Sequence, residues 1–152
     1  MNYLNSIIRS PLSVKLLFAI YAYSLYKYGS QLLQPEVIEK LGYSSTLIHM
    51  GISIVLIALI VLRVWWSWIA GISECTYFAA MSAYALTKGN HIISSATESA
   101  LQNPATSKLT PEQLKMGMSI GFYGGLGLVI AGGLVTAILW YKSRFYFESK
   151  TA

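Results

Sequence analysis

The sequence predicts an all-α protein, a polytopic integral membrane helix bundle with four or alternatively three transmembrane helices. The 152 residues are 55% hydrophobic and only 11% charged, whereas a soluble domain usually carries about 25% charged residues. Residues 46–62 form an apolar run without a formal charge. A helix of that length covers about 26 Å of the ~30 Å hydrocarbon core of a bilayer. We therefore expect a single membrane domain over residues 1–152.

The first candidate span covers residues 12–33. Ser10 and Pro11 are a helix-start signal, with Ser as the N-cap and Pro in the first turn. A cleavable signal peptide is the alternative, but the tyrosine-rich segment offers no small-x-small cleavage site. The following residues, 35–42, are expected to form a short interfacial helix.

The second candidate span covers residues 46–64, with Ser44 and Ser45 as expected caps. Arg63 is expected either to reach the lipid headgroups by snorkelling or to bind an anionic headgroup or a partner's carboxylate. Indole side chains favour the headgroup region of a bilayer. Three tryptophans form the expected interface belt after this span: Trp65, Trp66 and Trp68.

Residues 72–87 decide between four spans and three, because this segment is only moderately apolar and slightly short for a span. Lys88, Gly89 and Asn90 predict a helix C-terminus, since Lys suits the helix dipole and Gly or Asn stops a helix. Residues 91–109 are polar and predict a loop, in which one or two helical turns can occur. In the three-span alternative, residues 72–100 lie at the interface or extend the second helix out of the bilayer.

The last candidate span covers residues 116–141, which are uncharged and long enough to cross with tilt. A capping box is predicted just before it, from Thr110 to Gln113, and Trp140 and Tyr141 are expected to mark its far interface. Small residues lie along one face of this helix: Gly117, Gly121, Gly125 and Gly132. Because small residues let helices approach closely in lipid, we expect this face to pack against another helix, of this chain or of another membrane subunit.

The positive charges predict the orientation of the bundle. Arg9 and Lys15 precede or begin the first span, and Lys142 and Arg144 follow the last. The positive-inside rule therefore predicts both termini on the cytoplasmic or equivalent side, which requires an even number of spans. The net charge of +5 is scattered near span ends and includes no basic run, so no nucleic-acid partner is expected.

The chain offers few groups for cofactors or metals. His49 and His91 are its only histidines and could together hold a b-type haem. Interfacial histidines bonded to water or backbone are the favoured alternative, because each lies at the end of a span. The sequence contains no Asp, and Cys75 is its single cysteine, which argues against a metal site. The tyrosines of the first helix could approach a quinone, but aromatic packing is their usual role.

No nucleophile elbow, HExxH metalloprotease motif or phosphate loop occurs in the sequence. We therefore predict a small non-catalytic structural or accessory subunit of a multi-subunit membrane complex, with an energy-converting or respiratory assembly as one host. A self-associating holin-like protein, or a component of a transfer or secretion apparatus, is one alternative. A quinone- or haem-linked redox membrane protein is another.

Overall fold

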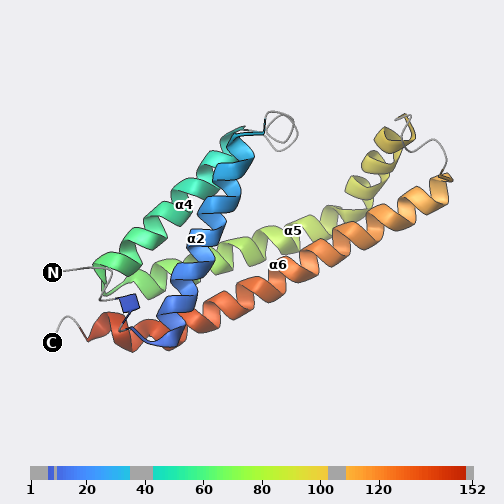
Figure 1. The fold of residues 1–152 in the computed structure, drawn as a ribbon. Coiled ribbons are helices and arrows are strands. Elements are labelled where there is room, and N and C mark those ends of the chain that lie inside the picture. The colour runs from blue at the N-terminus through green and yellow to red at the C-terminus, as the bar shows by residue number, and fades with distance from the viewer. Residues whose placement is uncertain (1–6, 9, 35–42, 103–108, 150–152) are drawn as a thin grey trace. The chain divides into compact units, whose positions relative to one another are not determined.

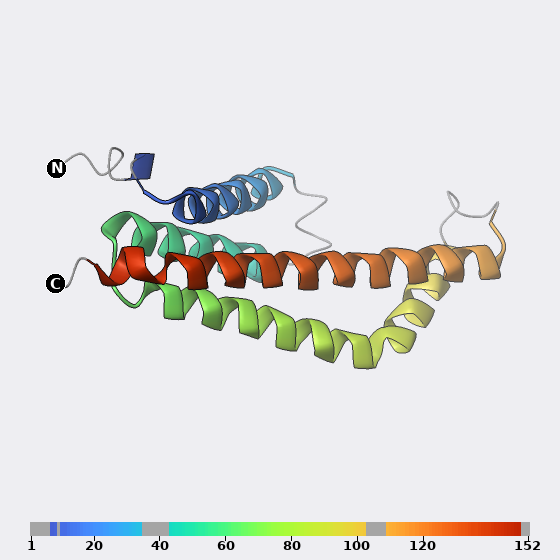
Figure 2. The same ribbon diagram turned by 90° about the horizontal axis from the view of Figure 1, so that it is seen from below.

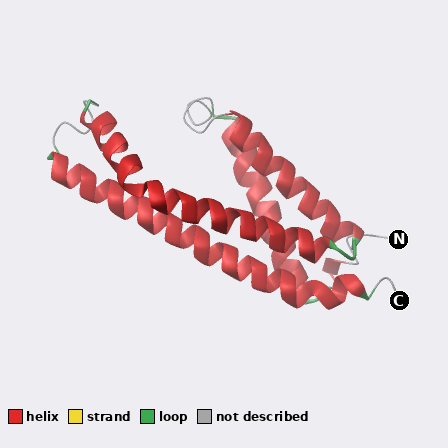
Figure 3. Ribbon diagram, turned by 180° about the vertical axis from the view of Figure 1, so that it is seen from behind, coloured by secondary structure: helices red, strands yellow, loops and turns green. Residues whose placement is uncertain are grey.

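The computed structural model describes residues 7–8, 10–34, 43–102 and 109–149. Four helices make up most of this part of the chain: α2 (Leu12–Leu32), α4 (Tyr43–Leu62), α5 (Ser67–Leu101) and α6 (Pro111–Glu148) (Figure 1). No strand occurs among the described residues (Figure 3), which confirms the all-α class. The short helix expected at residues 35–42 lies outside them, as does Arg9.

The chain forms two compact units. The first comprises Met1–Ser73 and Thr136–Ala152, and the second comprises Glu74–Val135. The first unit thus holds α2, α4, the first turns of α5 and the last turns of α6. The second unit holds the remainder of α5 and α6.

Helix α2 begins and ends close to the predicted limits of 12 and 33. Its N-cap residue is Pro11 rather than Ser10, and no side chain caps the helix. The Ser10 hydroxyl instead donates a hydrogen bond to the carbonyl oxygen of Ile7, at 2.6 Å. The predicted cap was wrong because this backward bond satisfies the serine before the helix starts.

Helix α4 begins at Tyr43, so Ser44 and Ser45 lie inside its first turn and are not the predicted caps. Its C-terminus is closed by two backbone bonds, from Arg63 N to Ile60 O at 3.2 Å and from Val64 N to Leu59 O at 3.2 Å. This pair is the Schellman pattern, whose closing residue has a left-handed backbone and is usually glycine. Here that residue is Arg63, with φ of 56°.

Helix α5 is longer than predicted and continues through Leu101. Lys88, Gly89 and Asn90 therefore do not end it, and residues 91–101 are helical rather than a loop. The part of α5 in the second unit bends before its last turns (Figure 2). The stop signal failed because Gly89 meets a neighbouring helix, as described below.

Helix α6 begins at Pro111 as predicted. The backbone N–H of Thr110 donates to Gln113 Oε1 at 3.0 Å, and the N–H of Gln113 donates to Thr110 Oγ1 at 3.2 Å. These reciprocal bonds are the predicted capping box. The helix passes Gly124 and Gly125 without interruption and is the longest among the described residues.

Two of the four helices, α4 and α6, are long and apolar enough to cross a membrane. Helix α4 corresponds to the predicted span 46–64, and α6 contains the predicted span 116–141. Helices α2 and α5 do not reach the same combination of length and hydropathy. The structure thus supports two spans by length and composition, and the four-span bundle stays a prediction.

Candidate functional site

The indole of Trp140 lies at the centre of the first unit. Its side chain is fully buried, and its Nε1–H donates a hydrogen bond to the Tyr21 hydroxyl at 3.0 Å. A Cβ atom built on Gly71 would overlap the indole ring, so only glycine fits there. The ring also lies 5.7 Å from the Phe147 ring, between centroids. Trp140 therefore contacts protein, whereas the neighbouring Tyr141 is 52% exposed.

Serine hydroxyls join the helices of the first unit. Ser143 Oγ of α6 donates to Ser13 Oγ of α2 at 2.8 Å. Ser53 Oγ of α4 lies 3.1 Å from Ser24 Oγ of α2. Ser53 and Ser143 are almost completely buried. Small hydroxyl side chains thus lie between these helices, an arrangement common where helices associate in lipid.

Arg63 joins the end of α4 to the end of α6. Its Nε and Nη2 donate to the carbonyl oxygen of Tyr146, at 3.0 and 2.7 Å, and Nη2 also donates to Ser149 Oγ at 2.7 Å. The guanidinium carbon lies 4.1 Å from the centroid of the Tyr146 ring. Tyr146 is in the last turn of α6, where helix carbonyls lack intrahelical donors. Arg63 therefore caps α6 through its side chain while ending α4 through its backbone.

The predicted interface tryptophans after α4 are only partly covered by the chain. Trp65 is 53% exposed and Trp66 is 43% exposed. Trp68 is half-buried, and its Nε1 is buried without a hydrogen-bond partner among the described residues. Trp65 and Trp66 thus keep large surfaces available outside the first unit.

The two histidines belong to different units. His49, in α4, hydrogen-bonds the carbonyl oxygen of Ser45 through Nδ1 at 2.9 Å, and its ring lies 4.9 Å from that of Tyr28. His91 is exposed on α5. Within the described residues, no three or more His, Cys, Asp or Glu side chains form a group suited to a metal ion. The structure therefore gives His49 a backbone partner in its own helix.

In the second unit, α5 presents a face of mostly small residues. Ser82, Gly89 and Ile93 are buried, and Ala85 between them is half-buried. Their spacing of three or four residues keeps them on one side of the helix. A Cβ built on Gly89 would lie 2.9 Å from the Tyr123 hydroxyl and 3.0 Å from Phe122 Cε1. Gly89 therefore admits the aromatic side chains of α6.

The predicted glycine face of α6 has room for an added Cβ at each of its four positions. Gly117, Gly121, Gly125 and Gly132 are exposed, and a Cβ built on any of them would find no atom within 4 Å. Leu126 lies on a different face of α6, because five residues at ~100° each place it ~140° around the helix from Gly121. It is half-buried. The close helix contacts of this fold thus involve Gly71 and Gly89 of α5. Small residues around Gly71 were a sequence signal for the first contact, whereas Gly89 fitted a helix end equally well.

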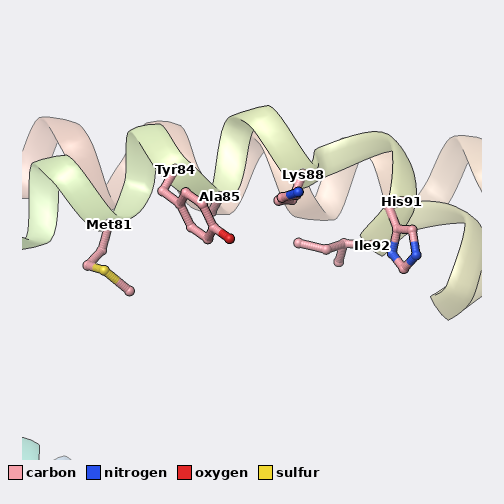
Figure 4. A pocket seen from close by; sticks show the side chains of 6 residues that line it. All are labelled: Met81, Tyr84, Ala85, Lys88, His91 and Ile92. Atoms are coloured by element: carbon pink, nitrogen blue, oxygen red, sulfur yellow. The ribbon is translucent and has the colours of Figure 1, made fainter.

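A shallow groove of about 480 Å³ runs along another side of α5 in the second unit. Figure 4 shows the side chains that line it. They are Met81, Tyr84, Ala85, Lys88, His91 and Ile92. Apolar side chains make up most of the lining, and Lys88 and His91 supply the nitrogen donors.

The described residues thus offer helix contacts, two exposed tryptophans after α4 and a groove on α5. Comparison of the chain with protein-family models, with curated proteins and with solved structures finds no match.

Proposed function

We propose that this chain is a small multi-pass integral membrane protein that acts as a non-catalytic accessory subunit of a larger membrane complex. One observation carries the proposal: small polar side chains are buried in the helix contacts beside a few apolar ones, while many large apolar side chains stay exposed. Ser67, Ser143 and Thr46 are at most 2% exposed, whereas Leu128 is 77% exposed and Met116 67% exposed.

This distribution suits lipid better than water. Soluble monomers seldom expose contiguous apolar patches larger than a few hundred Å². In a bilayer, apolar side chains face lipid, while close packing and hydroxyl groups hold helices together. None of the most apolar stretch of α6 is buried inside the chain, and only 22% of that of α4 is buried. Both helices therefore need lipid or partner chains to cover them.

The contacts of the first unit support a topology with both termini on one side. The bond between Ser13 and Ser143 joins the first turn of α2 to the end of α6. The bonds from Arg63 to Tyr146 bring the α4–α5 turn to the same end. Four spans with cytoplasmic termini agree with these contacts and with the positive charges at Lys15 and Lys142.

The open glycine face of α6 supports a role in assembly. In lipid, glycines at this spacing allow another helix to approach closely. The described residues leave Gly117, Gly121 and Gly125 uncovered. A partner subunit at this face would account for the spacing without requiring any catalytic group in this chain.

The experiment is purification in a mild detergent at native expression, followed by identification of the chains that co-purify. We compare Gly121→Leu with Gly127→Leu, which lies ~120° away around the helix. Both positions are exposed, and a Cβ added at either would find no atom within 4 Å. We expect Gly121→Leu to reduce recovery of partner chains several-fold and Gly127→Leu to leave it unchanged.

Three outcomes would contradict the proposal in different ways. Equal recovery of partner chains with both variants would show that the glycine face does not bind a partner subunit. A purified oligomer containing only this chain, together with membrane leakage on expression, would favour the holin-like alternative. Complete release of the chain from membranes by alkaline carbonate would show that it is not an integral membrane protein.

A further inference from the structure

The groove on α5 combines an apolar wall with a cation. Met81 and Tyr84 lie two turns and one turn before Lys88, and Ile92 lies one turn after it. Met81, Tyr84 and Ile92 are between 41% and 60% exposed. Figure 4 shows Met81, Tyr84 and Ile92 extending to the same side of the helix. This surface matches a molecule that has a hydrocarbon chain and an anionic group.

The contact between α5 and α6 in the second unit shows which part of α6 lies beside Lys88. Gly89, the next residue, faces Phe122 and Tyr123. Tyr123 lies about two helical turns, or ~10 Å, beyond Met116, where the uncharged stretch of α6 begins. Lys88 thus lies beside the apolar part of α6 and not beyond its end.

A cation at this level is costly unless it meets an anion or reaches the headgroups. A lysine side chain can extend its apolar stem along the helix and place the ammonium near the interface. Glu98 lies nearly three turns further along α5, and Glu112 lies before the uncharged stretch of α6. No ion pair between Lys88 and a carboxylate is present in the described part of the chain.

We propose that the α5 groove binds an anionic phospholipid. This inference rests on the membrane location proposed above. The acyl chain lies along Met81 and Tyr84, and the Lys88 ammonium pairs with the lipid phosphate. His91, one turn beyond Lys88 on the groove, supplies a second N–H donor to the same headgroup. The bound lipid covers the exposed side of α5 and neutralises a charge for which the described residues supply no carboxylate.

The test is lipid retention measured by native mass spectrometry. Wild type, Lys88→Gln and Lys115→Gln are reconstituted in bilayers of equal phosphatidylglycerol and phosphatidylcholine, and released with their bound lipids. Lys115 is a matched control, because it is an exposed lysine of α6 that does not line the groove. The charge change is the same in both variants.

We expect wild type and Lys115→Gln to retain phosphatidylglycerol about fivefold over phosphatidylcholine, as a contribution of about 1 kcal/mol per lysine implies. Lys88→Gln should retain the two lipids nearly equally. Equal retention by wild type, or the same loss in both variants, would overturn the proposal. Alkaline carbonate extraction separates this failure from that of the proposed function. A chain that stays in the membrane pellet without lipid preference refutes only the groove, whereas a released chain refutes the membrane location.

Discussion

Gly71 lies against the indole of Trp140 so closely that no side chain fits between them. The same indole donates its N–H to the hydroxyl of Tyr21. Helices α5, α6 and α2 therefore meet at one aromatic side chain in the first unit. Both the steric contact and the hydrogen bond require the ring in its observed position, so this junction should be sensitive to very small changes.

Gly71→Ala is expected to destabilise the chain by about 1–3 kcal/mol, the usual cost of overpacking a well-filled contact. Gly89→Ala should cost less, because its Cβ would approach the end of the Tyr123 side chain at 2.9 Å, and that side chain can shift. Gly51→Ala is the control: its site is open, and alanine favours a helix over glycine by ~1 kcal/mol. Thermal unfolding in detergent, followed by tryptophan fluorescence, measures the order. A Gly71→Ala variant as stable as Gly51→Ala would refute the close contact.

Arg63→Lys is expected to loosen the C-terminal turn of α6. Lysine cannot reproduce the paired Nε and Nη2 bonds to the Tyr146 carbonyl, although it leaves the backbone position occupied. Loss of a charged hydrogen bond worth about 1.4 kcal/mol would speed local amide exchange about tenfold. Hydrogen–deuterium exchange over residues 145–149 measures this.

Arg144→Lys is the matched control for Arg63→Lys, because Arg144 is also an arginine near the end of α6 that contacts aromatic rings. Its guanidinium carbon lies 4.2 and 4.4 Å from the centroids of the Tyr141 and Phe145 rings. Its replacement should leave exchange at the end of α6 close to that of wild type. The capping role of Arg63 would be excluded by wild-type exchange rates in Arg63→Lys, or by equal acceleration in the two variants.

We expect residues 12 and 148 to face the same side of the membrane, because Ser13 and Ser143 are hydrogen-bonded at 2.8 Å. Single cysteines replace Leu12, Glu148 or Thr110 in a Cys75→Ala background. An impermeant maleimide applied to sealed vesicles should label the first two alike and Thr110→Cys from the opposite side. Opposite labelling of positions 12 and 148 would leave three spans as the better description.

The purified chain is expected to show no Soret band and no catalytic activity of its own. The reason is the position of His49 in the second turn of α4, close to the end of that helix, where a histidine bonded to water or backbone is the usual case. An optical spectrum of protein purified in mild detergent decides this directly. A Soret band that disappears in His49→Ala would move the protein to the redox alternative.

Local sequence patterns correctly predicted helix features that depend only on residues close together in the sequence. The capping box at Thr110 and Gln113 started α6 where predicted, since both its bonds lie within four residues. The uncharged run in α4 likewise needed no distant partner to predict a membrane-length helix. The end of α5 was wrong because Gly89 suits either a helix end or a close helix contact. Only the approach of Phe122 and Tyr123 distinguishes these roles.

The sequence by itself determined the all-α class, the apolar helices and the start of α6, because these follow from composition, periodicity and short-range hydrogen bonds. The tertiary structure decided which residues serve the contacts. Trp140 became a core residue because Tyr21 offers an acceptor for its N–H. Arg63 adopts a left-handed backbone where glycine is usual, and its guanidinium reaches a carbonyl 83 residues away in sequence. These contacts join residues that are far apart in sequence. A local sequence pattern cannot predict them, because it does not specify how distant helices pack.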